Sequence, residues 1–443
     1  MKTKSEKQQI KSEKNKGFQM NLVNGKILND NEAHDALERL GELVLEARFS
    51  APPSAETVIA ACEKLGAMGA EFIPLLVKGG LSRERAEAEI ELARSMLSRE
   101  KLEARLKLEL GALEAEFTPI DSPVPVRHSL APLGTLLHIA AGNAEGLPAF
   151  SVIEGLLTGN VNILKPPSND GGLSAILLSR LVSVEPSLKN RIFVFDIPSS
   201  DTAKMRKLAA VSDAVVVWGG DEAVRGARLL ASPDTAIIEW GHKLSFCYAS
   251  GEVSEAELLG VCRNICETEQ LYCSSCQGIF LDTEDEAELF AFAERFADIL
   301  ERAAADATSA YGKRVRAQKT LEMRTLELEG SEKGMRIIKR KGCAVIAENK
   351  TALEPSLMFR TPWVRPLPRN RILKTLIPYK SRLQTASLIC PQRDSEALSE
   401  LLIRSGVVRL CAAERMSEAY CGVPHDGCMP LSRYVRIVSG ELS

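Results

Sequence analysis

Short apolar runs alternate with amphipathic stretches through the middle of the chain. Five strand candidates, rich in β-branched and other apolar residues, are separated by four stretches whose apolar residues recur every three or four positions. The strand candidates are 133–141, 161–165, 191–197, 214–220 and 235–241. This alternation is typical of a parallel, doubly wound α/β sheet, in which ligands bind at the carboxyl ends of the strands.

The chain on either side of this core has a different pattern. Residues 1–18 are a polar tail with six Lys and two Glu, predicted to be solvated, with a basic contact arm as the alternative. Helical periodicity dominates from about residue 31 to 116, and Ser54 and Ser82 are expected to begin two of the helices. After the core, further helix and strand patterns predict a second α/β lobe. The predicted divisions are 1–18, 19–125, 126–243, 244–420 and 421–443.

Composition narrows the classes of function. The 443 residues carry 56 Lys and Arg against 59 Asp and Glu, so there is no excess of positive charge to hold a polyanion and we expect no nucleic-acid partner. No run approaches the roughly 18 apolar residues of a membrane span, and the first residues lack the apolar core of a secretory signal. Eleven cysteines, an odd number, indicate reduced thiols. We therefore expect a cytoplasmic protein of enzyme size.

Polar residues that suit ligand binding stand where the predicted strands end. Asn143 follows the first strand between Gly142 and Gly146, which permit an unusual turn; an Asn that only forms the turn is the alternative. Lys165 ends the second strand before two prolines, where its ammonium is expected to meet a ribose or a phosphate. Extension of that side chain into water is the alternative. The glycines do not match the G-x-G-x-x-G dinucleotide fingerprint.

Two further side chains suit catalysis. Glu239 stands where the strand 235–241 meets a Gly turn, and desolvation there would raise the pKa of its carboxyl and favour acid–base chemistry. A salt-bridged structural Glu is the alternative. Cys273, in QLYCSSCQ, falls on a short polar turn between a predicted helix and a strand. A thiol in such a turn can be exposed and activated as a nucleophile.

The cysteines around this turn leave two other chemistries open. They are Cys262, Cys266, Cys273 and Cys276. Their spacing differs from the usual zinc patterns and the segment has no His, so we expect no metal. A redox C-x-x-C pair is the other alternative. The alternative to an enzyme is thus a non-catalytic redox or metal-binding protein.

Taken in order, five segments resemble the aldehyde dehydrogenase superfamily: the Asn turn, GNVNILKP, WGGD, EWGHK and QLYCSSCQ. They are most similar to its acyl-CoA reductase branch, the LuxC-like family of the fatty-acid reductase of bacterial bioluminescence, which also has a segment like HDG at 425–427. The resemblance covers roughly residues 120–430. It implies an aldehyde-dehydrogenase-like α/β fold, with a doubly wound NAD(P)-binding lobe over 126–243 and a catalytic lobe over 244–420. The helical N-terminal region over 19–125, which is predicted from its periodicity, shows no clear match to the family and is expected to pack on the nucleotide-binding lobe.

The resemblance implies catalytic roles for three residues. Cys273 corresponds to the nucleophile that forms an acyl-thioester intermediate. Asn143 corresponds to the amide that stabilises the oxyanion together with the Cys273 backbone N–H, a donor worth about 3 kcal/mol at the transition state. Glu239 corresponds to the general base of hydrolytic members, which thioester reduction does not require. Cys276 is the alternative nucleophile, three residues further on.

The resemblance also implies a nicotinamide cofactor. Lys165 corresponds to the lysine that holds the adenosine ribose, and Gly219 and Gly220 to the approach of the pyrophosphate. Ser168 stands where NAD-preferring members often carry a carboxylate, so we expect NADPH, with NADH as the alternative; a helix cap is the other role for Ser168. Asp221 departs from the family pattern because a carboxylate repels phosphate.

The function implied is reduction of an acyl thioester to the aldehyde by NAD(P)H through a Cys273 acyl-enzyme. The acyl donor is expected to be acyl-CoA, with a fatty acyl chain, or another acyl thioester. An acyl-phosphate reductase and an oxidative aldehyde dehydrogenase are the alternatives among enzymes, and a scaffold component of a reductase complex is one of another class. We expect a homo-oligomer, and a partner acyl-transfer enzyme stays open.

Overall fold

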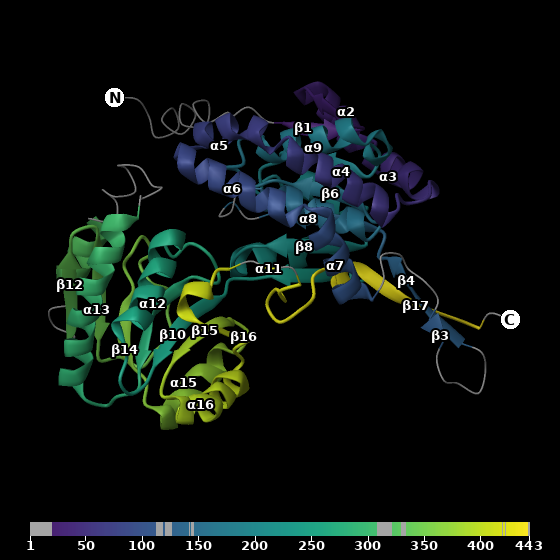
Figure 1. Ribbon diagram of the computed structural model, residues 1–443. Coiled ribbons are helices and arrows are strands. Elements are labelled where there is room, and N and C mark those ends of the chain that lie inside the picture. Colours follow the sequence, from purple (N-terminus) through teal and green to yellow (C-terminus); the bar gives the residue numbers. More distant parts are fainter. Residues whose placement is uncertain are drawn as a thin grey trace, which may run out of the picture. The chain divides into compact units, whose positions relative to one another are not determined.

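The computed structural model describes residues 20–111, 118–119, 126–140, 142, 146–307, 321–328, 334–418, 420 and 422–441. Two compact units are shown in Figure 1. The first contains the described residues up to Gly241, with 422–424 and 429–441, and the second those from His242 to Tyr420, with 425–428. The division after Gly241 lies two residues before the predicted one. The predicted tail 1–18 lies outside the described residues.

The sheet of the first unit has the predicted doubly wound form. Its strand order is β2-β1-β7-β6-β5-β8-β9, and the last five strands are parallel. These five are the predicted strands: β5 (Thr135–Ile139), β6 (Val161–Lys165), β7 (Ile192–Val194), β8 (Ala214–Trp218) and β9 (Ala236–Trp240). The order of the chain reverses between β5 and β8, which is the place where such sheets bind ligands.

Two strands at the edge of this sheet fall in the region predicted to be helical. They are β1 (Asn21–Val23) and β2 (Lys26–Leu28), and β1 pairs antiparallel with both β2 and β7. Asn24 and Gly25 join them with positive φ angles of 51° and 75°. Asn-Gly is the preferred sequence for such a two-residue hairpin turn. The helical prediction was wrong here because each strand has only three residues, too few for a visible periodicity.

Helices cover both faces of the first sheet. One core contains side chains of α4, α7, α8 and α9, and the other those of α2, α3, α10 and α11. Ser54 and Ser82 accept hydrogen bonds from the first turns of α4 and α6, as predicted. The bounds are α2 Asp30–Glu38, α3 Leu40–Phe49, α4 Ala55–Ala67, α5 Ile73–Gly79, α6 Arg83–Met96, α7 Arg99–Leu110, α8 Leu147–Leu157, α9 Leu173–Val184, α10 Thr202–Ala210 and α11 Asp221–Leu230.

The second unit has its own α/β sheet, as predicted. The strand order is β12-β13-β14-β11-β10-β15-β16, and only the β12–β13 pair is antiparallel. The strands are β10 Leu244–Ala249, β11 Cys276–Leu281, β12 Met335–Arg340, β13 Cys343–Glu348, β14 Trp363–Pro366, β15 Leu383–Ile389 and β16 Arg409–Cys411. α12 (Glu255–Thr268) and α13 (Glu286–Asp306) pack in one core, and α15 (Ile372–Leu376) and α16 (Gln392–Ser405) in the other.

A small third sheet completes the first unit. β17 (Val435–Glu441) pairs antiparallel with β4 (Val126–Pro132), which pairs with β3 (Thr118–Pro119). None of the helices in the described part of the chain is long and apolar enough to cross a membrane.

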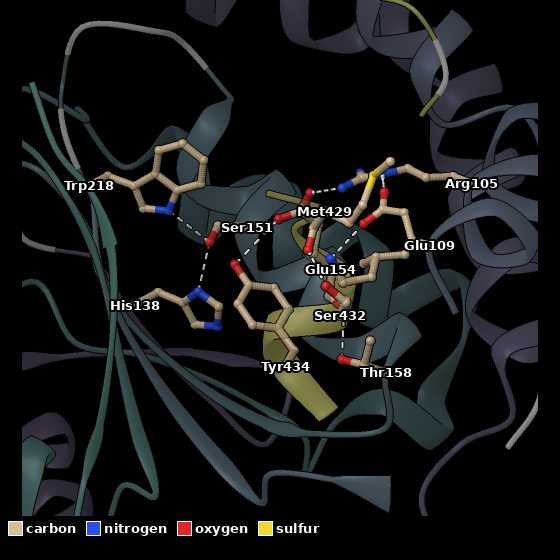
Figure 2. A network of polar contacts seen from close by, with 11 residues as sticks. Arg105, Glu109, His138, Ser151, Glu154, Thr158, Trp218, Met429, Ser432 and Tyr434 are labelled. Carbon is tan, nitrogen blue, oxygen red and sulfur yellow. Dashed lines mark hydrogen bonds and ion pairs between the residues drawn. The ribbon is translucent and has the colours of Figure 1, made fainter. Parts of the chain in front are cut away.

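A buried ion-pair network ties α8 to α7 and to the segment before β17 (Figure 2). Glu154 of α8 forms an ion pair with Arg105 of α7, which also pairs with Glu109. The three side chains are 4%, 12% and 0% exposed. Glu109 accepts a hydrogen bond from the Leu431 backbone N–H at 2.7 Å, and the Tyr434 hydroxyl donates to Glu154 at 3.4 Å. Two carboxylates thus hold one buried guanidinium and anchor the C-terminal segment.

We predict that Glu154→Ala destabilises the first unit by about 1.5–3 kcal/mol, because it removes buried, charge-assisted hydrogen bonds to Arg105 and Tyr434 while Arg105 keeps its ion pair with Glu109. Urea unfolding followed by the fluorescence of Trp218 and Trp240 measures the change. Glu91→Ala is the matched control, because it removes the exposed helical ion pair with Arg94 and should cost less than about 1 kcal/mol. Equal losses in the two variants would contradict the prediction.

Candidate active site

Cys273 lies in the turn between α12 and β11, where the sequence predicts it. α12 ends at Thr268, β11 begins at Cys276, and Cys273 between them is a partly exposed residue. Cys276, the alternative nucleophile, is fully buried, and its thiol donates to the Gly278 carbonyl oxygen at 3.3 Å. Burial raises the pKa of the Cys276 thiol to about 12. Of the two cysteines, Cys273 is therefore the more exposed residue.

Side chains from neighbouring elements hold the backbone of this turn. Ser245 of β10 donates to the Cys273 carbonyl oxygen at 2.7 Å and accepts from the Thr385 backbone N–H of β15 at 3.0 Å. Within the turn, the Tyr272 N–H donates to Oγ of Ser275 at 3.0 Å. β10 is irregular at Ser245, where its registers with β11 and β15 both shift. The backbone of Cys273 is thus hydrogen-bonded to β10 at the point where the pairing of that strand is irregular.

Two buried glutamines fix the chain on both sides of the turn. Nε2 of Gln270 donates to the Cys276 carbonyl oxygen at 3.0 Å, and its Oε1 accepts from the Thr361 N–H at 2.9 Å. Oε1 of Gln277 accepts from both the N–H and the hydroxyl of Ser356, at 3.0 and 2.8 Å. The segment 356–361 therefore serves as the hydrogen-bonding partner of the turn.

That supporting segment has an unusual backbone. Met358, Phe359 and Arg360 have φ angles of 61°, 48° and 63°, and Glu269 has one of 49°. A run of non-glycine residues in the left-handed region is costly and is kept only where surrounding contacts impose it. Here the Phe359 N–H donates to the Glu269 carbonyl oxygen at 2.8 Å, and the side chains of Arg360 and Glu269 form a buried ion pair at 2.9 Å.

The sulfur of Cys273 has a side-chain amide beside it. Nε2 of Gln384, on β15, lies 3.3 Å from Sγ and donates to Oδ1 of Asp426 at 2.7 Å. The Lys243 ammonium lies 3.6 Å from Oδ2 of the same carboxylate. Burial raises the pKa of the Cys273 thiol, and the Asp426 charge adds to this, whereas the hydrogen bond from Gln384 lowers it.

A tight turn places Asp426 in this cluster. His425 and Cys428 exchange both backbone hydrogen bonds, at 2.8 and 2.9 Å, and Asp426 and Gly427 between them have φ angles of 50° and 77°. Asp-Gly is a preferred sequence for such a turn. The turn belongs to the second unit, although the described residues just before and after it belong to the first.

The residues predicted to bind the nucleotide lie in the first unit. Lys165 ends β6 and is 5% exposed, so its side chain is buried rather than extended into water. Burial lowers the pKa of its ammonium, and the nearby Asp196 carboxylate opposes the shift. Gly219, after β8, has a φ of 151°, and a Cβ there would lie 2.9 Å from the Ala223 Cβ. Gly220 caps α11, which begins at Asp221 as predicted.

The chain after β6 contains Ser168 and the chain after β5 contains Asn143, two more residues predicted to belong to the site. Ser168 is exposed, and the side chain that accepts from the first turn of α9 is that of Asp170, 3.0 Å from the Ser174 N–H. Asn169 donates to the Gly142 carbonyl oxygen at 2.7 Å. A Cβ on Gly142 would lie 1.8 Å from Oδ1 of Asn169, so a larger residue there would displace the Asn169 side chain. Asn143 itself lies outside the described residues.

A hydrogen-bond chain connects the end of β8 to α8 (Figure 2). The Trp218 indole N–H donates to Oγ of Ser151 at 3.1 Å, and that hydroxyl lies 2.7 Å from Nδ1 of His138 on β5. Burial lowers the pKa of His138 to about 4, so the ring is neutral at pH 7. The chain fixes the strand end from which Gly219 and Gly220 follow.

Glu239 is a salt-bridged glutamate, the alternative to a general base in the sequence analysis. Its side chain is 31% exposed and forms an ion pair with Arg228 of α11, whose Nε donates to Oε1 at 2.6 Å. We expected a desolvated Glu239 carboxyl at an apolar strand end, and this expectation was wrong because Arg228 forms an ion pair with it. Among the described residues, no group of three or more His, Cys, Asp or Glu side chains could hold a metal ion.

Sequence reasoning missed three residues of the cysteine site. Gln384 stands one residue before a predicted strand, and its polarity in an apolar run was the available signal. Lys243 and Asp426 lie in EWGHK and HDG, which were noted only for their resemblance. Nothing in the linear sequence brings positions 243, 384 and 426 together.

A family model described as acyl-CoA reductase (LuxC) matches residues 72–437. The chain is 27% identical over 321 residues to the long-chain acyl-protein thioester reductase of Aliivibrio fischeri, covering 70% of this chain and 64% of that protein. It is 25% identical to the enzyme of the same name from Vibrio harveyi, covering 70% and 65%. The chain thus spans about two thirds of the length of these relatives.

Solved aldehyde dehydrogenases share the fold. A benzaldehyde dehydrogenase from Corynebacterium glutamicum superposes with a TM-score of 0.69 at 14% identity, covering 96% of this chain and 98% of that one. Aldehyde dehydrogenase 21 from Physcomitrella patens gives 0.71 at 13% identity, covering 96% and 95%. The predicted aldehyde-dehydrogenase-like fold is confirmed.

Proposed function

Because the chain belongs to the acyl-CoA reductase (LuxC) family, we propose that it reduces an acyl thioester to the aldehyde with a nicotinamide nucleotide. The names of the relatives, long-chain acyl-protein thioester reductases, support a long acyl chain on a thioester. The observation that carries the proposal is the partly exposed Cys273 with the amide of Gln384 beside its sulfur.

The chemistry follows from the thiol. The Cys273 thiolate attacks the thioester carbonyl, a new C–S bond forms, and the substrate C–S bond breaks. The departing thiol takes up the proton that Cys273 gave up. Reduction of the acyl-enzyme then breaks the bond to Cys273, which releases the aldehyde and returns the thiolate. Asn143 is proposed, from the resemblance, to donate to the oxyanion.

The first unit fits the cofactor. The close approach at Gly219 suits a pyrophosphate, and the buried Lys165 ammonium suits the hydroxyls of a ribose. Gly220 at the start of α11 adds the backbone N–H groups of a helix N-terminus. When bound, the nicotinamide supplies the hydride that reduces the acyl-enzyme. We propose NADPH, with NADH as the alternative, because the exposed Ser168 brings no charge against a 2′-phosphate.

Acyl-CoA or a protein-bound acyl thioester is the proposed donor, and a partner acyl-transfer enzyme would supply the protein-bound form. A cytoplasmic location is supported by the thiols, since every described cysteine is free. We also propose that the protein is a homo-oligomer.

We predict that Cys273→Ala abolishes covalent acylation and NAD(P)H-dependent aldehyde formation. Cys276→Ala should keep both, because that thiol is fully buried. Mass spectrometry of the protein and its peptides after treatment with a long-chain acyl-CoA locates the acyl group. An acyl-enzyme in Cys273→Ala would show that another residue is the nucleophile. Absence of acylation in the parent protein with every thioester tried would contradict the proposed function itself.

Glu239→Gln should lower acyl thioester reduction less than tenfold, or roughly 1.4 kcal/mol of barrier, because no water is activated. It should slow oxidation of the aldehyde in the reverse direction more strongly. Arg228→Gln is the matched control, since it breaks the same ion pair and leaves the carboxylate. A larger loss of thioester reduction in Glu239→Gln than in the control would assign the carboxylate to the reductive chemistry.

For cofactor choice, Ser168→Glu should lower kcat/KM for NADPH far more than for NADH, because it sets a negative charge against the 2′-phosphate. Steady-state rates with both nucleotides give the ratio. Ser187→Glu is the control, since Ser187 is exposed on a short 3-10 helix (Pro186–Leu188) of the same unit. Equal losses with the two nucleotides would show that Ser168 does not lie at the ribose.

A further inference from the structure

One amide nitrogen in the second unit touches two acceptors of different kinds. Nε2 of Gln384 lies 3.3 Å from the Cys273 sulfur and 2.7 Å from Oδ1 of Asp426. An ionised carboxylate only accepts hydrogen bonds, so the side of the amide that faces Asp426 must be the nitrogen. The two hydrogens of that nitrogen can then serve the carboxylate and the sulfur together.

The other end of the same amide indicates that this orientation is imposed. Gln384 is 7% exposed, and its Oε1 is buried with no hydrogen-bond partner among the described residues. Leaving a buried acceptor unsatisfied costs free energy. Rotating the amide by half a turn would place Oε1 against the Asp426 carboxylate, which is worse. Asp426 therefore selects the orientation in which N–H groups face Cys273.

Asp426 is itself held rigidly. It occupies a left-handed turn position closed by the paired backbone hydrogen bonds of His425 and Cys428. Lys243 lies 3.6 Å from its Oδ2 and donates to the Ser381 carbonyl oxygen at 2.9 Å. The His425 ring lies 3.9 Å from the same oxygen. Two cationic or ionisable groups thus offset the charge of the carboxylate.

We propose that Gln384 is a catalytic residue that stabilises the Cys273 thiolate, and that Asp426 is a positioning residue that keeps the Gln384 amide turned toward the sulfur. The role rests on the proposed function, in which Cys273 is a thiolate at two steps of the reaction. It is the nucleophile that attacks the thioester, and it receives the electron pair when the C–S bond to the aldehyde carbon breaks. A hydrogen bond to charged sulfur is stronger than one to the neutral acylated sulfur, so it favours both steps.

The negative charge of Asp426 by itself would destabilise the Cys273 thiolate, which is opposite to the effect of positioning Gln384. A carboxylate near a thiol disfavours the thiolate, so removing the charge should raise the reactivity of Cys273 whichever residue replaces Asp426. Positioning depends instead on whether the replacement can still accept from Nε2. Asn keeps a carbonyl oxygen at this place and Gly does not. Both residues tolerate the left-handed backbone of position 426, so neither replacement strains the turn.

The test is the rate at which iodoacetamide alkylates Cys273, followed by peptide mass spectrometry in the absence of substrate and nucleotide. Gln384→Met should lower the rate about tenfold or more. Asp426→Asn should keep at least half of the parent rate, whereas Asp426→Gly should lower it at least fivefold. Thr385→Val is the matched control, because it changes the neighbouring buried residue of β15 without touching the sulfur, and it should leave the rate unchanged.

An unchanged rate in Gln384→Met would overturn the role of the amide. A rate in Asp426→Gly equal to or above that of Asp426→Asn would overturn the positioning role, since it would show that Asp426 acts through its charge alone. The alkylation rate requires no reductase activity. Failure of acyl transfer in a protein whose thiol responds as expected would therefore contradict the proposed function and leave this inference standing.

Discussion

The cysteine site depends on one constraint, which is that the polar groups of a largely buried turn must all be hydrogen-bonded. Cys273 follows the end of a helix and precedes a strand, so neither element pairs its backbone. Polar side chains supply the partners instead: Ser245 reaches the Cys273 carbonyl oxygen, and Gln270 and Gln277 fix the chain on either side. The support is rigid because each of these side chains is buried and forms hydrogen bonds with backbone groups. A thiol on a rigid backbone keeps its position when a substrate arrives.

The same need explains costly features around the turn. Left-handed backbone at Arg360 and its neighbours lets the supporting segment face the turn with its N–H groups, and the buried ion pair with Glu269 fixes that segment. Gln384 leaves one acceptor unsatisfied so that its nitrogen serves the sulfur and Asp426. Strain and unsatisfied polar groups gather where proteins hold a reactive group, and here they gather within one cluster of the second unit.

In the first unit the determining feature is the order of the strands. The chain reverses direction between β5 and β8, so the loops after these two strands open at the same edge of the sheet. Gly219 follows β8 with a positive φ, and a Cβ there would lie 2.9 Å from the Ala223 Cβ, whereas Gly142 follows β5 and accepts a hydrogen bond from Asn169. The hydrogen bonds from Trp218 through Ser151 to His138 connect the end of β8 to α8 and to β5. The nucleotide site that we propose at this edge therefore rests on backbone geometry more than on charged side chains.

The sequence by itself determined the doubly wound sheet, because five apolar strands and their amphipathic helices are local patterns whose period is visible in the residues. It also determined the turn that holds Cys273, since the helix before it and the strand after it are both long enough to recognise. Only the tertiary structure decided that Glu239 is salt-bridged to Arg228 and that Gln384 and Asp426 meet at the sulfur. The reason is physical: a periodicity is a property of neighbouring residues, whereas the surroundings of a side chain depend on elements that are distant in the chain and meet only when the sheet forms.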